Sequence, residues 1–429
     1  DLATGPVAPA NGWGWAVRLL SGWARGRCLL LSALLLALAA CGPVRSAPGL
    51  DIRRLNPMGG LSGGAALSRA AHLSVDQVAQ QMVGRLSLDD KLGQLIIMQF
   101  TEQDYTPAQA AMIQPYHPGG AILYSYAMGT AGQVKSLLAS AQRDSPIPML
   151  TMTDLEGGWI DHLAEYVGPH MSAPDMAATG DPQIATAQGA KVAHDLLSFG
   201  FNADLAPDVD VELVAGPDQV GRDFGSTPEP VVTYAGAFLR GLQPAGVVGT
   251  LKHFPGLGDA TSDAHADLPV INRSRADIEA TELAPYRALI ASGQAQMIMS
   301  TDLLMPALDP NMPAELSRPI VTGILRDELH FNGVAITDAL YMTGIQDKYY
   351  FSEAAVMAIE AGNDMIMAPF TPGMIADTIA GLKAALDSGA LTMDQINTSV
   401  ERILALKLRY HLLPMPADAP GRVAGPPAA

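Results

Sequence analysis

Short apolar runs alternate with amphipathic stretches along most of this chain. Helical patterns lie between most of the apolar runs, for example at 181–200, 229–246 and 275–293. The apolar runs lack the alternation of a half-exposed strand, which is typical of a parallel sheet covered on both faces. They predict buried strands at 95–100, 120–125, 148–153, 201–207, 247–254, 295–301, 333–338 and 364–369. Eight strands, each followed by a helical pattern, predict a single α/β domain at 74–412, a (β/α)₈ TIM-type barrel.

A doubly wound open sheet is the alternative. No glycine-rich dinucleotide-binding fingerprint follows the first strand, which weakens that alternative. A barrel would gather the carboxyl ends of its strands at one rim, where the active sites of this fold lie. One Asp at a strand end can simply cap the next helix, but polar groups from five or more strands predict a site. These groups are Asp154, Glu156, Asp208, Asp210, Lys252, His253, Asp302, Asp338, Asn363 and Asp364.

Composition limits the classes of function. The chain carries 26 Lys and Arg against 43 Asp and Glu, a balance that disfavours a nucleic-acid partner. Its two cysteines, Cys28 and Cys41, both lie near the N-terminus, so the folded part has no thiolate metal site or disulfide framework. No histidine pair has ligand spacing on a helix, and we expect no metal and no cofactor. The 20 methionines are expected to fill the core.

The N-terminal segment resembles an export signal. Arg18, Arg25 and Arg27 precede an uncharged run at 28–40, which is shorter than the roughly 20 residues that span a bilayer. The run ends in "LAAC", which resembles the lipobox of bacterial lipoproteins and implies lipidation of Cys41. We therefore expect a signal peptide at 1–41 and an exported protein that is lipid-anchored to the outer face of the bacterial cell membrane. An ordinary signal peptide that contains a cysteine is the alternative.

Two further segments have the composition of unstructured chain. Residues 42–73 are rich in Gly, Pro, Ser and Ala and have no sustained periodicity, which predicts a flexible tether. Residues 413–429 predict a disordered tail for the same reason.

The segment "KHFPGLGDATSDAHADLP" at 252–269 concentrates titratable side chains on a loop. Pro255, Gly256 and Gly258 exclude a helix there, and the segment does not alternate like a strand. An imidazole on such a loop exchanges protons near neutral pH without being buried. A neighbouring carboxylate, as in "SDAH", would orient the ring and stabilise its charged form. From spacing alone, a solvated loop histidine is equally compatible with the pattern.

Several motifs together resemble glycoside hydrolase family 3, and in particular its single-domain exo-β-N-acetylglucosaminidases. They are "DLEGG", "GFNADLAPDVDV", "GRDFGSTPEP", "KHFPGLGDATSDAH" and "FNGVAITDALYM", in that order, and the resemblance covers about residues 82–410. It implies a retaining enzyme that removes terminal β-linked N-acetylhexosamine from cell-wall or chitin-like glycans. By resemblance, Asp338 is the nucleophile, and Asp263 with His265 forms an acid/base dyad on a mobile loop.

The resemblance also implies contacts with the terminal sugar. Asp154, Arg222, Lys252 and His253 are expected to bond its hydroxyls, whereas Asp208 and Asp210 are expected to bond loop amides. The sequence departs from the family at four positions, since arginines usually stand at Trp159 and His162, and histidines often stand at Leu257 and Thr301. We keep Trp159 and His162 among the expected substrate-binding residues, because a tryptophan there could stack on a sugar face.

Two other functions remain open from the sequence. The first is a family 3 β-glycosidase that prefers a sugar without an N-acetyl group, which the lost arginines leave possible. The second is a non-enzymatic glycan-binding barrel on the cell surface, although the intact Asp338, Asp263 and His265 argue against it.

Overall fold

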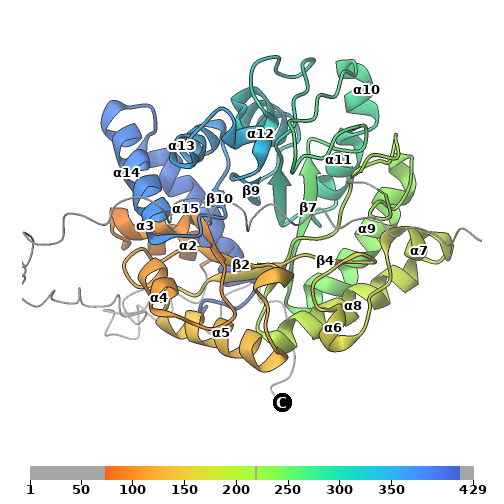
Figure 1. The fold of residues 1–429 in the computed structure, drawn as a ribbon. Coiled ribbons are helices and arrows are strands. Elements are labelled where there is room, and N and C mark those ends of the chain that lie inside the picture. The colour runs from red at the N-terminus through yellow and green to blue at the C-terminus, as the bar shows by residue number, and fades with distance from the viewer. Residues whose placement is uncertain (1–72, 218–219, 416–429) are drawn as a thin grey trace, which may run out of the picture. The chain divides into compact units, whose positions relative to one another are not determined.

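The computed structural model describes residues 73–217 and 220–415 and confirms the predicted barrel. Eight parallel strands close in the order β1-β10-β9-β8-β7-β6-β3-β2 (Figure 1). They are β1 Ile96–Phe100, β2 Gly120–Leu123, β3 Leu150–Thr153, β6 Ala203–Asp204, β7 Val248–Phe254, β8 Met297–Ser300, β9 Val334–Ala339 and β10 Met365–Met367. Each predicted strand is present. The strand predicted at 201–207 is the shortest, and Pro207, which lacks an amide hydrogen, follows it.

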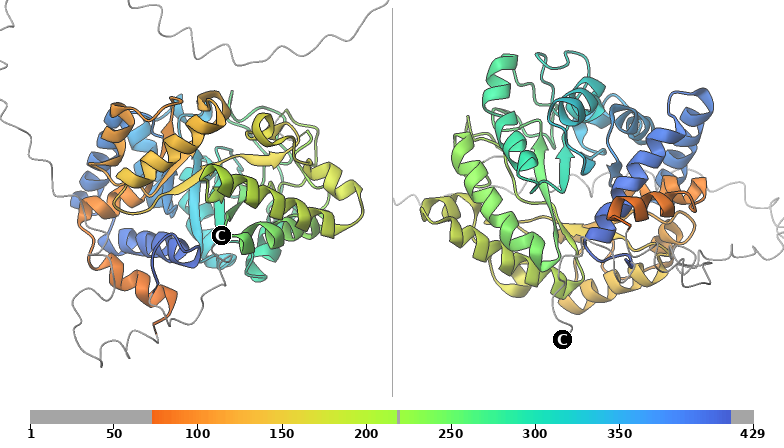
Figure 2. Two further views of the ribbon diagram at one scale, coloured as in Figure 1. Left: turned by 90° about the horizontal axis from the view of Figure 1, so that it is seen from below. Right: turned by 180° about the vertical axis from the view of Figure 1, so that it is seen from behind.

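Helices surround the barrel on its outside (Figure 2). The α-helices are α2 Val75–Val83, α3 Leu88–Gln94, α4 Pro107–Ile113, α5 Ala131–Asp144, α6 Ala164–Val167, α7 Ala173–Ala178, α8 Pro182–Phe199, α9 Pro228–Leu242, α10 Arg275–Ala280, α11 Leu283–Ala291, α12 Thr343–Gln346, α13 Phe351–Ala361, α14 Pro372–Ser388 and α15 Met393–Arg409. The 3₁₀ turns η2 Ser125–Ala127, η3 Gln243–Ala245 and η4 Ala314–Leu316 and the π-helix η5 Pro319–Glu328 complete the set.

Local sequence explains where several helices begin and end. Asp181 caps α8 by accepting a hydrogen bond from the backbone of Gln183, and Gly200 ends that helix in the left-handed conformation, with φ +98°. The helix predicted at 275–293 is divided into α10 and α11. Pro285 explains the division, because it has no amide hydrogen to offer the carbonyl of Thr281.

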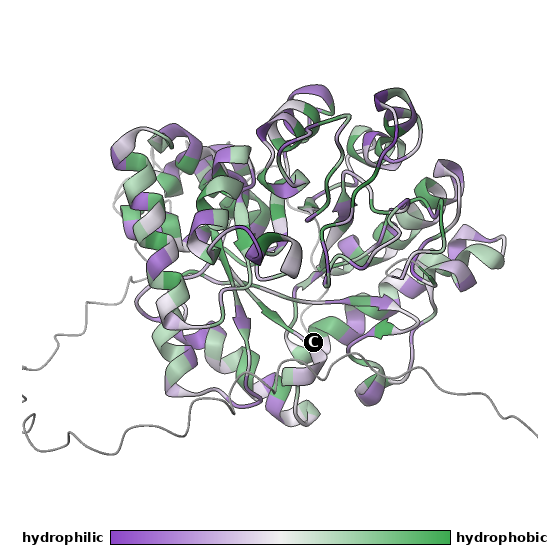
Figure 3. Ribbon diagram, turned by 45° about the horizontal axis from the view of Figure 1, so that its top comes forward, coloured by the Kyte–Doolittle hydropathy of each residue, from purple (hydrophilic) through white to green (hydrophobic). Residues whose placement is uncertain are grey.

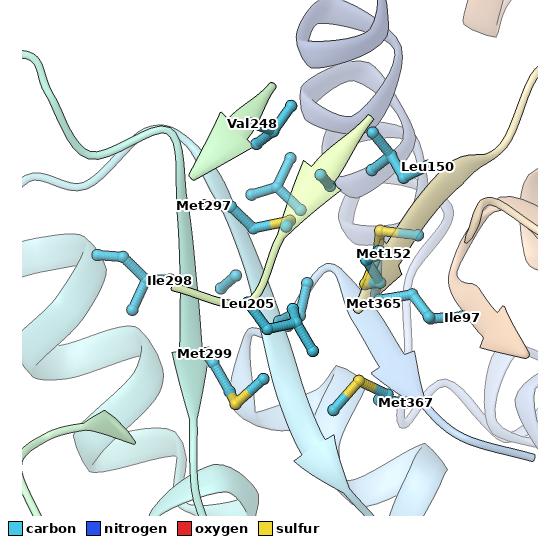
Figure 4. Close-up of a cluster of buried hydrophobic side chains, with 14 of the residues drawn as sticks. Ile97, Leu150, Met152, Leu205, Val248, Met297, Ile298, Met299, Met365 and Met367 are labelled. Carbon is cyan, nitrogen blue, oxygen red and sulfur yellow. The ribbon is translucent and has the colours of Figure 1, made fainter. Parts of the chain in front are cut away.

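The barrel interior is packed with apolar side chains, and methionine is prominent among them. Met297 and Met299 on β8 and Met365 and Met367 on β10 are all 0–2% exposed. Figure 4 shows them near one another, close to Leu205. The hydropathy colouring of Figure 3 shows how the helices mix apolar and polar positions. The prediction that these methionines fill the core is confirmed.

The last helix lies against the first ones, so the two ends of the described chain meet. Helix α15 packs on α2 and α3, and the buried Lys407 of α15 donates a 2.7 Å hydrogen bond from Nζ to Oε1 of Gln94. Leu413, just beyond α15, is buried. The predicted signal peptide at 1–41, including Cys41, lies outside the described residues, as does most of the predicted tether and tail. No helix within 73–217 or 220–415 has the length and apolar content that a bilayer crossing requires.

A two-stranded hairpin follows β3 and was not predicted from the sequence. It consists of β4 Leu155–Gly157 paired with β5 Ile160–Asp161. Gly157 and Gly158 form its turn with φ values of +89° and +63°, which favour glycine. A Cβ on Gly157 would lie 2.2 Å from the carbonyl oxygen of Met171, so this turn accepts no side chain at that position.

Candidate active site

The residues predicted from the sequence gather at the carboxyl ends of the barrel strands. Asp154 directly follows β3, Lys252 and His253 lie near the end of β7, and Asp338 lies near the end of β9. Arg222 comes from the segment between β6 and α9. This is the end at which TIM-barrel enzymes carry their active sites.

Glu156 of the hairpin connects the predicted sugar-binding residues into one buried charged group. Its carboxylate accepts hydrogen bonds from Arg222 Nη2 at 2.7 Å and Nε at 2.9 Å, and lies 2.6 Å from Lys252 Nζ. Lys252 also donates a 2.7 Å bond to Asp154. Burial alone would raise the pKa of Glu156, but the charges of Arg222 and Lys252 outweigh it and hold that pKa well below its usual range. Two cations therefore face two carboxylates at the floor of the site.

A second buried group, Asp208, Asp210 and His253, contacts Arg222 of the first group. Asp210 accepts hydrogen bonds from the amides of His253 and Leu257 at 3.3 and 2.7 Å, and Asp208 accepts one from the amide of Asp210 at 2.8 Å. This confirms the expectation that both aspartates bond loop amides. Asp210 also lies 2.8 Å from His253 Nδ1, while Arg222 lies 3.3 Å from His253 Nε2. Burial alone would lower the pKa of His253, but the bond to Asp210 and the charges of Asp208 and Asp210 outweigh it and raise that pKa.

The same group has the ligand types of a metal site, which the expectation of no metal did not consider. Ligand atoms of Asp208, Asp210 and His253 lie within 4.8 Å of one another. The Arg222 guanidinium stands 3.7 Å from Asp208 Oδ2 and supplies a positive charge beside it. Burial and the neighbouring charge of Asp210 raise the pKa of Asp208 to about 7. Arg222 thus already offsets part of the negative charge of this group.

Trp159 and His162 differ in burial: Trp159 is exposed, whereas His162 is partly buried. Trp159 is 58% exposed, its Nε1 donates a 2.8 Å hydrogen bond to the carbonyl of Val220, and its ring lies 5.9 Å from the Arg222 guanidinium carbon. His162 lies deeper, with Nδ1 3.0 Å from the Thr153 hydroxyl. Burial lowers the pKa of His162, so the ring is neutral at pH 7. Trp159 therefore offers an aromatic face beside the charged floor, and His162 offers neutral hydrogen-bonding groups.

Asp338 is held by hydrogen bonds to both of its carboxylate oxygens. The amide of Ala339 donates to Oδ1 at 2.7 Å, and the hydroxyl of Thr301 donates to Oδ2 at 3.0 Å. The backbone amide of Asp338 donates to Oε2 of Glu315 at 3.1 Å. These bonds fix the half-buried carboxylate at the end of β9.

Asp263 and His265 contact each other on the loop after β7. The ring Nδ1 of His265 lies 3.0 Å from Oδ1 of Asp263, and the same oxygen accepts the His265 amide at 2.8 Å. The side chain of His265 is 67% exposed and that of Asp263 is 43% exposed. Thr343 at the start of α12 donates a 3.0 Å hydrogen bond to the carbonyl of His265, which ties this loop to the segment that follows Asp338. A histidine beside a carboxylate can transfer protons to and from a bound group.

Two residues of this site, Glu315 and Thr301, were not selected from the sequence, and a third, Glu156, was selected only as one of the polar groups at the rim. Glu156 was visible in "DLEGG" at a strand end, but nothing in the sequence indicated that it would join Arg222 to Lys252. Glu315 lies in η4, away from any predicted strand end, and no sequence signal marked it. Thr301 was noted only as a departure, whereas its hydroxyl contacts Asp338.

Known proteins resemble this chain over most of the described residues. The family model for the glycosyl hydrolase family 3 N-terminal domain matches residues 87–406. Beta-hexosaminidase A of Pseudoalteromonas piscicida is 31% identical over 71% of this chain and 55% of its own length. Beta-hexosaminidase LpqI of Mycobacterium tuberculosis is 32% identical over 75% of this chain and 83% of its own length.

Solved structures agree with these matches. A glycoside hydrolase family 3 beta-N-acetylglucosaminidase from Paenibacillus sp. str. FPU-7 superposes with a TM-score of 0.72 and 34% identity, covering 76% of this chain and 63% of that one. The chain thus spans somewhat over half the length of some relatives and most of the length of others. With the family model covering three quarters of the sequence, from α3 through most of α15, the chain belongs to glycosyl hydrolase family 3.

Proposed function

We propose that this protein is a retaining exo-β-N-acetylglucosaminidase that removes terminal β-linked N-acetylhexosamine from cell-wall or chitin-like glycans. The observation that carries the proposal is the exposed Asp263–His265 pair on a loop bonded to the segment after Asp338. A retaining glycosidase needs one carboxylate to attack the sugar and one group to protonate the leaving oxygen. The names of the relatives, beta-hexosaminidase and beta-N-acetylglucosaminidase, support the N-acetylated sugar.

Asp338 acts as the nucleophile in this mechanism. Its carboxylate attacks the anomeric carbon of the terminal sugar while the glycosidic bond breaks, which forms a covalent glycosyl-enzyme. His265 donates a proton to the departing oxygen, and the Asp263 carboxylate stabilises the imidazolium before the transfer. In the second step, His265 takes a proton from water, the water attacks the anomeric carbon, and Asp338 is released.

The charged floor binds the terminal sugar in this proposal. The side chain of Asp154 is 14% exposed and that of Lys252 is 3% exposed, and both offer hydrogen-bonding atoms to sugar hydroxyls. Arg222 is engaged with Glu156 on one edge and lies under the Trp159 ring on one face. Because Glu156 pairs with both cations, the side chains of Lys252 and Arg222 are already oriented before sugar arrives, which reduces the entropy cost of binding.

Two sets of substrates test the reaction and the assignment of roles. Aryl glycosides of N-acetylglucosamine and of glucose separate this activity from a non-acetylated preference, and turnover of neither would indicate a glycan-binding barrel. Asp338→Ala is expected to abolish turnover of every substrate. His265→Ala is expected to lose far more activity on a disaccharide than on a dinitrophenyl glycoside, which departs without a proton.

The chain offers a matched control for the histidine substitution. His194 on α8 is also exposed, at 81%, and its Nδ1 also lies 3.0 Å from an aspartate, Asp195. His194→Ala is expected to leave the ratio of the two activities unchanged. Equal losses on both substrates for His265→Ala, or a sugar label on a carboxylate other than Asp338, would contradict the assignment.

We also propose that the protein is exported and lipid-anchored through Cys41, facing the outside of the cell. The lipobox-like "LAAC" in the sequence supports this proposal. A match of 35% identity to an uncharacterized secreted glycosyl hydrolase of Arthroderma benhamiae supports export. Such a location would place the enzyme beside peptidoglycan fragments, its expected substrates.

A further inference from the structure

Two buried acids lie beside Asp338 and have no role in the proposed reaction. Asp302 follows β8 and Glu315 belongs to η4, and both are fully buried. One carboxyl oxygen of each, Oδ2 of Asp302 and Oε1 of Glu315, has no hydrogen-bond partner among the described residues. Burying a charged and unpaired carboxylate is costly, so the protonation of these acids needs an explanation.

The hydrogen bonds around Thr301 define that protonation. The Thr301 hydroxyl has one hydrogen and lies 3.0 Å from Asp338 Oδ2 and 3.4 Å from Asp302 Oδ1. It donates along the shorter contact, to Asp338. The contact with Asp302 is then favourable only if Asp302 carries a proton that it can share with the threonine oxygen.

The surroundings of both acids favour this neutral form. Burial, and then the negative charge of Asp338, raise the pKa of Asp302 well above its usual range. Burial together with the charges of Asp302 and Asp338 raises the pKa of Glu315 in the same way. Of the three neighbouring acids, Asp338 is the one that is not fully buried and that accepts a hydrogen bond at each carboxylate oxygen, so the negative charge is best stabilised there.

We propose that Thr301 is a positioning residue for the nucleophile, and that Asp302 and Glu315 are neutral acids that hold Thr301 and the end of β9 in place. Asp302 acts through the Thr301 hydroxyl, and Glu315 acts through the backbone amide of Asp338. The proposal rests on the proposed function, because it takes Asp338 as the nucleophile. It assigns a role to Thr301, at a position where the family often has histidine.

Removing the Thr301 hydroxyl takes one hydrogen-bond donor away from Asp338. The other titratable groups that face Asp338 are Glu315, Asp302 and the phenols of Tyr124 and Tyr341. The imidazole of His265 lies near Asp302 and supplies positive charge when protonated. A hydrogen bond to a carboxylate favours its charged form, so without the Thr301 hydroxyl the acidic limb of the kcat/KM profile should move to higher pH.

The test compares isosteric substitutions on an aryl glycoside. Thr301→Val is expected to lower kcat about 10- to 100-fold with little change in KM, as loss of a hydrogen bond to a charged group does. It is also expected to move the acidic limb of the kcat/KM profile upward by about one pH unit. Thr301→Ser should restore both. Thr250→Val is the matched control, because Thr250 is fully buried and its hydroxyl has no partner among the described residues.

A second pair of variants tests the neutral acid. In Asp302→Asn the amide stays uncharged and can donate to Thr301, so the acidic limb should stay close to that of the wild type. In Asp302→Leu no donor remains, and the limb should move in the same direction as in Thr301→Val. The proposal is overturned if Thr301→Val keeps the kcat and acidic limb of the wild type, or if Asp302→Asn moves the limb as far as Asp302→Leu.

Trapping with a fluorinated glycoside separates this proposal from the function on which it rests. Mass spectrometry of the wild-type glycosyl-enzyme should place the sugar on Asp338. If another residue carries the sugar, the proposed mechanism itself is wrong. If Asp338 carries it and Thr301→Val forms the same species with the rate and pH dependence of the wild type, only the positioning role of Thr301 is wrong.

Discussion

Replacing Glu156 with glutamine tests the charged floor through its stability. Lys252, Arg222, Asp154 and Glu156 carry two positive and two negative charges, and the side chain of Glu156 is 4% exposed. Glu156→Gln keeps the shape but leaves one buried positive charge in excess and turns an amide NH₂ toward two donors. Breaking a buried ion pair in this way costs about 3–5 kcal/mol. In a large domain each kcal/mol lowers Tm by about 2 °C, so the Tm of Glu156→Gln should be lower by about 6–10 °C.

The stabilisation by Glu156 should also depend on pH, in a direction that its lowered pKa determines. The folded-state pKa of Glu156 lies below the unfolded value of about 4.3, so the carboxylate stabilises the protein fully above that value. As the pH falls below it, the unfolded chain takes up a proton first and the stabilisation is lost. The difference in urea unfolding free energy between wild type and Glu156→Gln should therefore be full at pH 7 and smaller at pH 4.

An exposed ion pair provides the control for this experiment. Asp89 lies 2.6 Å from Lys383 Nζ but is 66% exposed, and Asp89→Asn should cost well under 1 kcal/mol because solvent screens the pair. Equal stability of Glu156→Gln and Asp89→Asn would refute this reasoning. A loss of unfolding free energy that is the same at pH 4 as at pH 7 would also refute it, because the ion pairs of Glu156 would then not stabilise the site.

Three further predictions concern other parts of the chain. Arginine at both Trp159 and His162 should change KM for N-acetylglucosaminides more than kcat, since a contact made equally in ground and transition states behaves so; an unchanged KM would remove both positions from the sugar site. Lys407→Met should stabilise the protein by up to about 4 kcal/mol at pH 6, because burial lowers the pKa of Lys407 to about 7. Because the unfolded lysine titrates near pH 10.4, this gain should shrink as the pH rises from 7 to 10, and urea unfolding at three pH values measures it. Cys41→Ala should release the protein from the membrane fraction or block its processing, and unchanged partition would exclude the lipid anchor.

The strands and the positions of their polar ends followed from the sequence because both are local properties. A buried parallel strand is apolar at consecutive positions, so its place in the chain can be predicted from the sequence. Lys252, His253 and Asp338 stand where such apolar runs end, so their place at the strand ends could be predicted as well. The pattern could not show how long each strand would be, since β6 retains only Ala203–Asp204 of a longer apolar run.

The partners within the site depend on distances that no local pattern contains. Glu156 and Arg222 are 66 residues apart and meet only because the hairpin after β3 folds toward the loop after β6. Asp338 and Glu315 meet because η4 returns to the end of β9. An acidic residue in a turn or short helix looks like any solvated acid in the sequence, so Glu315 could not be selected without the closed barrel.

The hairpin after β3 carries a buried charged residue on one side of its turn and an exposed aromatic residue on the other. Glu156 precedes the Gly157–Gly158 turn and is enclosed among charges, whereas Trp159 follows it and faces solvent. A side chain exchanged at Trp159 loses the hydrogen bond to Val220 and the contact with Arg222 but otherwise meets solvent, while one added at Gly157 would clash with the backbone of Met171. Under the proposed function, the preference for a glycan can therefore change at this one tip position without disturbing the ion pairs of Glu156.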